Sequence, residues 1–165
     1  MSLVAVGPLS VPKEKLLTAL LNSGALYTWW NQPANVADRL YYSMFRVPDM
    51  QAARPFGVIE LTKDFSYEQF SGGDQNYLSL RGGALRLTLT DIDRYPNDIH
   101  DGDLFFENNL GLVIQDLAAI AGADDSLTIS RISFEQTPTR NPPAAWQTEG
   151  MYLWCSLLIR YGDLA

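Results

Sequence analysis

The chain has 165 residues, of which 47% are hydrophobic and 19% are charged, and these proportions are typical of one folded domain. A formal net charge of −7 argues against a general affinity for nucleic acid or for anionic lipid. The single cysteine, Cys155, excludes both an internal disulfide and a zinc site built from cysteines.

The N-terminal residues do not match a secretory signal. The first eight residues lack the basic region of a secretory signal. No apolar run approaches the roughly 18 residues that a membrane helix needs. We therefore expect an intracellular origin.

The first third of the chain combines one clear helix with an aromatic segment. Residues 11–22 are predicted to be helical, because Pro12 suits a first turn, leucines form a stripe, and Gly24 follows as a stop. Residues 36–45 fit either a second helix or a pair of strands. We interpret residues 25–53 as an aromatic-rich insertion or linker.

The rest of the chain alternates between strands and one long helix. Apolar residues repeat every three or four positions over 103–121, which predicts the principal helix. The final strand is apolar on both faces, so we expect a central strand that is covered on both sides. The predicted fold is α+β, with a small, mostly antiparallel (mixed) β-sheet packed with the principal helix and the N-terminal helix. The predicted strands are 58–64, 77–80, 85–90, 127–134 and 151–161.

The connection between the last two predicted strands is unusually long. Hairpin strands are commonly joined by about two to five residues, whereas residues 137–149 separate these two. Pro138, Pro142 and Pro143 cannot donate hydrogen bonds to a sheet, and Trp146 is a large apolar group in the same stretch. We interpret this connection as a hairpin arm near the C-terminus that docks on a partner.

Five arginines and tryptophans are candidate anchors of a protein interface. Both residue types are enriched among interface hot spots. Arg140 lies at the predicted tip of the arm with Trp146 nearby in sequence, and Arg54 precedes the first predicted strand. The adjacent Trp29 and Trp30 cannot easily both enter one core, so we expect one of them to face a partner.

Acidic residues are concentrated in the segment 91–125, which holds nine acids and a single base, Arg94. Paired carboxylates within Asp91–Asp103 could bind calcium, although the spacing does not match the twelve-residue calcium loop. Asp101 and Asp103 also suit helix capping. We favour capping and a polar, partner-facing surface over a metal site.

Other signs of catalysis are weak. The only histidine, His100, lies in a polar loop, and no serine occupies a nucleophile-elbow motif. The glycine pairs 72–73 and 82–83 lack the spacing of a phosphate-binding or dinucleotide-binding loop. We expect no enzymatic activity, no cofactor and no metal.

The order of elements resembles the tail-terminator (tail-completion) and neck proteins of long-tailed bacteriophages. The resemblance covers residues 54–162, which would be the core of a single domain 1–165. It is carried by Arg54–Leu61, the strand 85–89, the helix 106–120, the motif Pro138–Pro142 and the final strand 150–162.

The resemblance implies a structural virion protein without catalytic residues. Such a protein forms a ring with copies of itself, commonly a hexamer, that caps the tail tube protein and meets the head–tail connector or neck proteins. DNA would pass through this ring without specific binding, and the ring would assemble in the host cytoplasm. Two alternatives stay open: a non-viral adaptor that presents the long loop to a protein partner, and a metal-binding enzyme that uses Asp91–Asp103.

Overall fold

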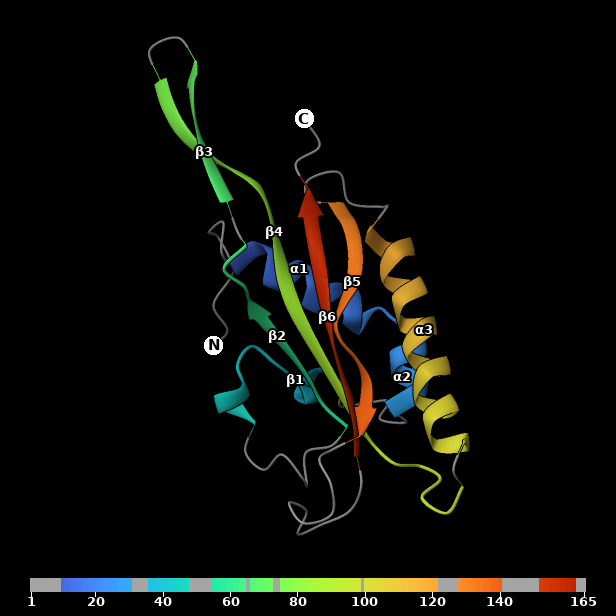
Figure 1. Cartoon of the computed structure of the whole chain (residues 1–165). Helices are drawn as coiled ribbons and strands as arrows, with labels where there is room; N and C mark the ends of the chain where they lie inside the picture. The colour runs from blue at the N-terminus through green and yellow to red at the C-terminus, as the bar shows by residue number, and fades with distance from the viewer. Residues whose placement is uncertain are drawn as a thin grey trace.

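The computed structural model describes residues 10–30, 36–47, 55–64, 66–72, 75–98, 100–121, 128–140 and 152–162. These residues form the predicted α+β fold (Figure 1). The elements in chain order are α1 (Ser10–Leu21), α2 (Gly24–Trp30), the 3-10 helix η1 (Ala37–Arg39), β1 (Leu40–Tyr41), the 3-10 helix η2 (Met44–Arg46), β2 (Gly57–Leu61), β3 (Ser66–Gly72), β4 (Gln75–Ile92), α3 (Asp101–Ala121), β5 (Thr128–Arg140) and β6 (Tyr152–Gly162).

The sheet is mixed and nearly antiparallel, as predicted. Its strands follow the spatial order β1-β2-β4-β6-β5, and only the β1–β2 pair is parallel among the described strands. The centre consists of β4 and β6, which pair from Gly82–Ile92 against Tyr152–Gly162. This places β1 at one edge of the sheet and β5 at the other.

One face of the sheet is covered by all three α-helices. Side chains alternate between faces along a strand, and every second residue of β4 and β6 joins the helices in one buried cluster. The apolar spacing of α3 places its buried stripe on the same cluster. The main contributors are Leu16 and Leu20 from α1, Leu26, Trp29 and Trp30 from α2, Leu85, Leu87 and Leu89 from β4, Phe106, Leu110, Val113 and Leu117 from α3, and Cys155, Leu157 and Ile159 from β6.

The second face of the sheet is partly polar. The strand β6 is central, as expected, but the α-helices contribute only to the cluster on the first face. On the second face the hydroxyl groups of Thr88 and Ser156 lie 3.2 Å apart. There Arg86 on β4 also donates to Glu135 on β5, with 2.9 Å between Nη2 and Oε1. The α-helices thus pack on one face of β6, while residues 153–161 of this strand are buried or half-buried on both faces.

The helix α2 is an element that the aromatic composition of residues 24–30 concealed. Its N-terminus is held by side chains, because Ser23 Oγ accepts a hydrogen bond of 3.2 Å from the amide of Leu26. Asp116 on α3 accepts from the hydroxyl of Ser23 (2.8 Å) and from the amide of Ala25 (3.0 Å). These bonds join α2 to α3, so this part of the aromatic segment is integral to the core.

The strand β5 is longer than predicted and contains Pro138. The prediction that the prolines end the sheet here is wrong for Pro138, because β5 is an edge strand whose free side needs no donor. Register shifts between Phe134 and Gln136 and between Gln136 and Thr139 accommodate the change of geometry. Pairing continues to Arg140, which lies opposite Leu153.

A β-hairpin extends beyond the body of the sheet (Figure 1). It consists of β3 and the first half of β4, paired from Ser66–Gly72 against Gln75–Gly82. The sequence predicted only a turn and a short strand in this region. Within the described chain, β3 pairs with β4 and with no other strand.

Candidate functional site

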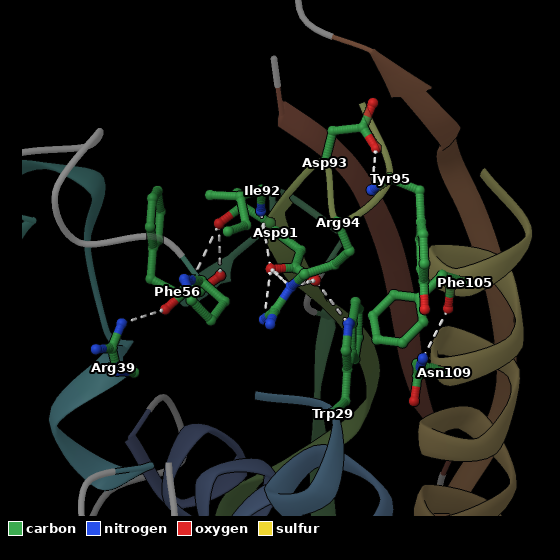
Figure 2. Close-up of polar contacts among 12 residues, drawn as sticks. Trp29, Arg39, Phe56, Asp91, Ile92, Asp93, Arg94, Tyr95, Phe105 and Asn109 are labelled. Carbon is green, nitrogen blue, oxygen red and sulfur yellow. Dashed lines mark hydrogen bonds and ion pairs between the residues drawn. The ribbon is translucent and has the colours of Figure 1, made fainter. Parts of the chain in front are cut away.

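The end of β4 carries a buried aspartate that organises one corner of the fold. The side chain of Asp91 is 1% exposed, and three groups converge on its carboxylate (Figure 2). They are the indole Nε1 of Trp29 at 2.9 Å, the amide of Ile92 at 2.8 Å and Nη2 of Arg94 at 3.0 Å. Burial raises the pKa of Asp91, while the hydrogen bond from Arg94 opposes that rise. The carboxylate is thus a structural acceptor that holds α2 against the sheet.

A second network joins the end of β4, the start of α3 and the end of β5. Arg140 donates through Nη1 to Asp93 Oδ2 and through Nη2 to Asp103 Oδ1, the latter at 2.7 Å. The hydrogen bond to Asp93 raises the pKa of Arg140, so the guanidinium keeps its charge. Gly102 makes this approach possible, because a Cβ at that position would collide with Asp93 Oδ1.

A pocket lies between α3 and the paired ends of β5 and β6, beside this second network. Its volume is about 310 Å³. Its lining combines apolar side chains that are almost fully buried with a charged rim, and Glu107 of this rim is exposed to solvent. The lining residues are Asp103, Phe106, Glu107, Pro138, Thr139, Arg140 and Leu153. A pocket of this kind suits an apolar group that carries a cation next to it.

The carboxylates that suggested a cation site are held by protein groups. Asp91 bonds to Arg94, and both Asp93 and Asp103 bond to Arg140. In the described part of the chain, no three His, Cys, Asp or Glu side chains come together as a metal-binding group. These contacts account for three of the nine acids in the segment 91–125 by internal pairing.

His100 and Cys155 are the histidine and the cysteine that could act as a base or a nucleophile. His100 is exposed, and its backbone amide donates to Asp98 at 2.8 Å. Cys155 is buried in the core, and burial raises the pKa of its thiol to about 12. The thiolate that would attack a substrate is therefore scarce near neutral pH.

The interpretation that Trp29 or Trp30 faces a partner is wrong, because both are buried in the same core. Their exposed fractions are 2% and 1%. The ring of Trp29 meets Phe106 edge-to-face at 5.1 Å, and the two tryptophan rings are tilted by 51° with centroids 6.4 Å apart. Both fit because α2 lies in the cluster formed by the sheet and α3. Trp30 Nε1 is a buried donor without a hydrogen-bond partner in the described structure.

The remaining predicted anchors have different outcomes. Arg140 ends β5 and pairs with Asp93 and Asp103 of its own chain, so it does not lie at the tip of an arm. Arg54, Trp146 and nearly all of the predicted arm lie outside the described residues.

Sequence reasoning missed the residues that now define exposed and recessed surfaces. Phe45 is 99% exposed, and it ends the segment 36–45, for which the sequence predicts either a helix or a pair of strands. Glu107 and Leu153 line the pocket, but they are 46 positions apart in the chain, so no local motif joins them. The sequence offered one sign of an exposed Phe45, which is its position next to the charged Arg46 in a segment without clear periodicity.

Comparison with known proteins gives no assignment. No protein-family model matches the chain, and no curated protein matches it either. In the described residues, no helix is both long and apolar enough to cross a membrane.

Proposed function

We propose that this chain is a structural virion protein that forms a ring at the head-proximal end of a phage tail. The ring terminates the tail tube and joins it to the head connector. The observation that carries this proposal is the β3–β4 hairpin, which extends past the sheet and pairs with no further strand in the described chain (Figure 1). A hairpin of two strands is only marginally stable in water, and its free edges offer unpaired backbone groups. It is therefore suited to docking on a neighbouring protein.

The distribution of polar groups also favours assembly. The carboxylates of Asp91, Asp93 and Asp103 bond to arginines, and the thiol of Cys155 is buried. A ring subunit needs two different surfaces, one toward each neighbour. The two edge strands of this sheet differ, because β1 has 2 residues and β5 has 13. The net charge of −7 suits a channel through which DNA passes without binding. The expected partners are copies of the chain, most simply six, together with the tail tube and the connector.

The test measures the mass of the purified protein by size-exclusion chromatography with light scattering, alone and with isolated tail tubes. Wild type is expected to form a ring that negative-stain images show at the tube end. A variant in which a short turn replaces residues 66–82 should fold but stay monomeric, with circular dichroism as the control for folding. A wild-type chain that remains monomeric in the presence of tubes would refute the proposal. Normal rings from the shortened variant would show that the hairpin is not the assembly arm.

A further inference from the structure

Phe45 is exposed to solvent on a turn whose backbone is fixed by hydrogen bonds. It lies on η2, where Ser43 Oγ accepts a 3.2 Å hydrogen bond from the amide of Phe45. The amides of Arg46 and Val47 close the same turn, with bonds of 3.0 and 3.2 Å to the carbonyl groups of Ser43 and Met44. Met44 packs beneath it on a small buried cluster. An aromatic ring that is 99% exposed on such a turn is unusual, because burial of a phenyl group contributes about 1.5–3 kcal/mol.

The residue beside Phe45 adds a cation to this apolar group. Arg46 is exposed, and none of the ion pairs in the described chain involves it. Together, Phe45 and Arg46 form an apolar and basic projection, which we name the Phe45–Arg46 knob. Arginine and aromatic side chains are the groups that most often contribute strongly to an interface.

The pocket between α3 and β5 has the complementary chemistry. Its volume of about 310 Å³ equals the space of roughly ten water molecules, which is more than a six-carbon ring displaces. Pro138 adds a partly exposed apolar side chain to the lining, and Glu107 adds an exposed carboxylate. Phe106 and Leu153 also line the pocket, although only 1% and 3% of their surface is exposed. The helix α3 contains four acids and no lysine or arginine, so its field attracts a basic group.

The knob and the pocket are at opposite edges of the same sheet. The knob follows β1, which is one edge strand, and the pocket borders β5, which is the other (Figure 1). One molecule cannot fill its own pocket across the sheet. A contact between a second copy's knob and this pocket leaves one knob and one pocket free, so the contact can repeat, and it forms a ring when the rotation between copies closes.

We propose that Phe45 of one copy inserts into the α3–β5 pocket of the next copy, with Arg46 placed beside Glu107. This inference rests on the proposed ring, and it adds a second contact between subunits to that of the β3–β4 hairpin. The contact is head-to-tail, because each copy donates its knob on one side and offers its pocket on the other.

The first experiment compares Phe45→Ala with wild type by sedimentation velocity over a range of concentrations, with and without tail tubes. Removal of a buried anchor should raise the dissociation constant at least about tenfold. Leu21→Ala is the matched control, since Leu21 on α1 is an exposed apolar residue that belongs neither to the knob nor to the pocket lining. Its association should be unchanged. Thermal melting should show that both variants fold, and assembly of Phe45→Ala at the wild-type concentration would overturn the inference.

The second experiment exchanges the charges. Arg46→Glu and Glu107→Arg should each weaken association, and the double variant should recover most of it. Lys63→Glu makes the same change in net charge as Arg46→Glu at another exposed position, and it should leave association intact. Absence of recovery in the double variant would overturn the pairing.

The two proposals fail in different ways. If rings form on tail tubes and no knob or pocket substitution changes their formation, the docking is overturned and the tail assignment stands. Association that depends on Phe45 but never involves tail tubes supports the docking and overturns the tail assignment. A wild-type chain that stays monomeric even with tubes overturns both.

Discussion

Replacement of the two buried tryptophans by phenylalanine should have unequal effects on stability. Trp29 and Trp30 are neighbours on α2 and are equally buried, so each loses a similar ring volume when it becomes phenylalanine. They differ in the indole nitrogen. Nε1 of Trp29 donates to the carboxylate of Asp91 at 2.9 Å, whereas Nε1 of Trp30 is buried without a partner. The pair of variants therefore separates the hydrogen bond from the packing.

The expected difference in the free energy of unfolding follows from the two indole nitrogens. A hydrogen bond to a charged group contributes about 1.5–3 kcal/mol, and a buried donor without a partner costs about 1–3 kcal/mol. Trp29→Phe loses the bond and leaves Asp91 with fewer donors, while Trp30→Phe removes an unsatisfied group. We expect Trp29→Phe to lower the free energy of unfolding by about 2 kcal/mol more than Trp30→Phe does.

Urea denaturation followed by far-UV circular dichroism measures this difference without relying on tryptophan fluorescence. In a chain of this size, about 2 kcal/mol corresponds to a difference in melting temperature of roughly 4–8 °C. Equal m-values for the two variants would show that both unfold from comparable native states. Equal destabilisation by the two substitutions would refute the account of Asp91 as the acceptor that holds α2.

Two further predictions concern the same corner of the fold. Burial raises the pKa of Asp91 in the folded protein above its ordinary value of 3.8. At pH values between 3.8 and this raised pKa, the native state therefore binds more protons than the unfolded state. The contribution of Asp91 to stability therefore falls as pH rises through this window. Asp91→Asn cannot titrate at this position, so wild type should gain stability relative to this variant as pH is lowered. Chemical denaturation at several pH values measures the difference in the free energy of unfolding. A difference that shrinks as pH is lowered contradicts the burial argument. Gly102→Ala should destabilise, because its methyl group collides with Asp93, whereas Gly111→Ala should stabilise by about 0.5–1 kcal/mol, because its methyl group meets no atom within 4 Å on an exposed turn of α3. Thermal melting of both glycine variants should give shifts of opposite sign, and a stabilised Gly102→Ala would contradict the crowding at Asp93.

The two long helices could be predicted from the sequence because each has a single apolar stripe. Residues 11–22 and 103–121 were predicted, and the helices span Ser10–Leu21 and Asp101–Ala121. The alternation along 85–90 likewise predicted a strand with one buried face. These signals are local, since each depends on one element lying against one core.

Elements whose form depends on distant residues could not be predicted in this way. The helix α2 has no simple period because it contacts both α3 and the sheet, and its start is held by Asp116, about 90 positions later in the chain. Pro138 was taken as the end of a strand because a proline breaks an interior ladder, but nothing local indicates that β5 is an edge strand. The pairing of Arg140 with Asp93 joins residues 47 positions apart. No spacing rule relates such residues before the sheet order is known.

The arm inferred from the long connection between the last two strands must also be reconsidered. Pairing of β5 with β6 continues to Arg140 opposite Leu153, so the connection now comprises residues 141–151. Its first neighbour in the chain, Arg140, is fixed by Asp93 and Asp103. The described element that extends furthest from the sheet is instead the β3–β4 hairpin (Figure 1).

The ion pairs of Arg140 have a second consequence, because the same residues line the α3–β5 pocket. Arg140 joins Asp103 on α3 to the end of β5, and both residues line the pocket. Disruption at Gly102 acts on Asp93 and through it on Arg140, so it should deform the pocket as well as lower stability. If Phe45 docks there, Gly102→Ala should weaken assembly even at temperatures where the variant is folded, while Gly111→Ala should not. The internal salt bridges of one subunit would then determine how well it receives the next.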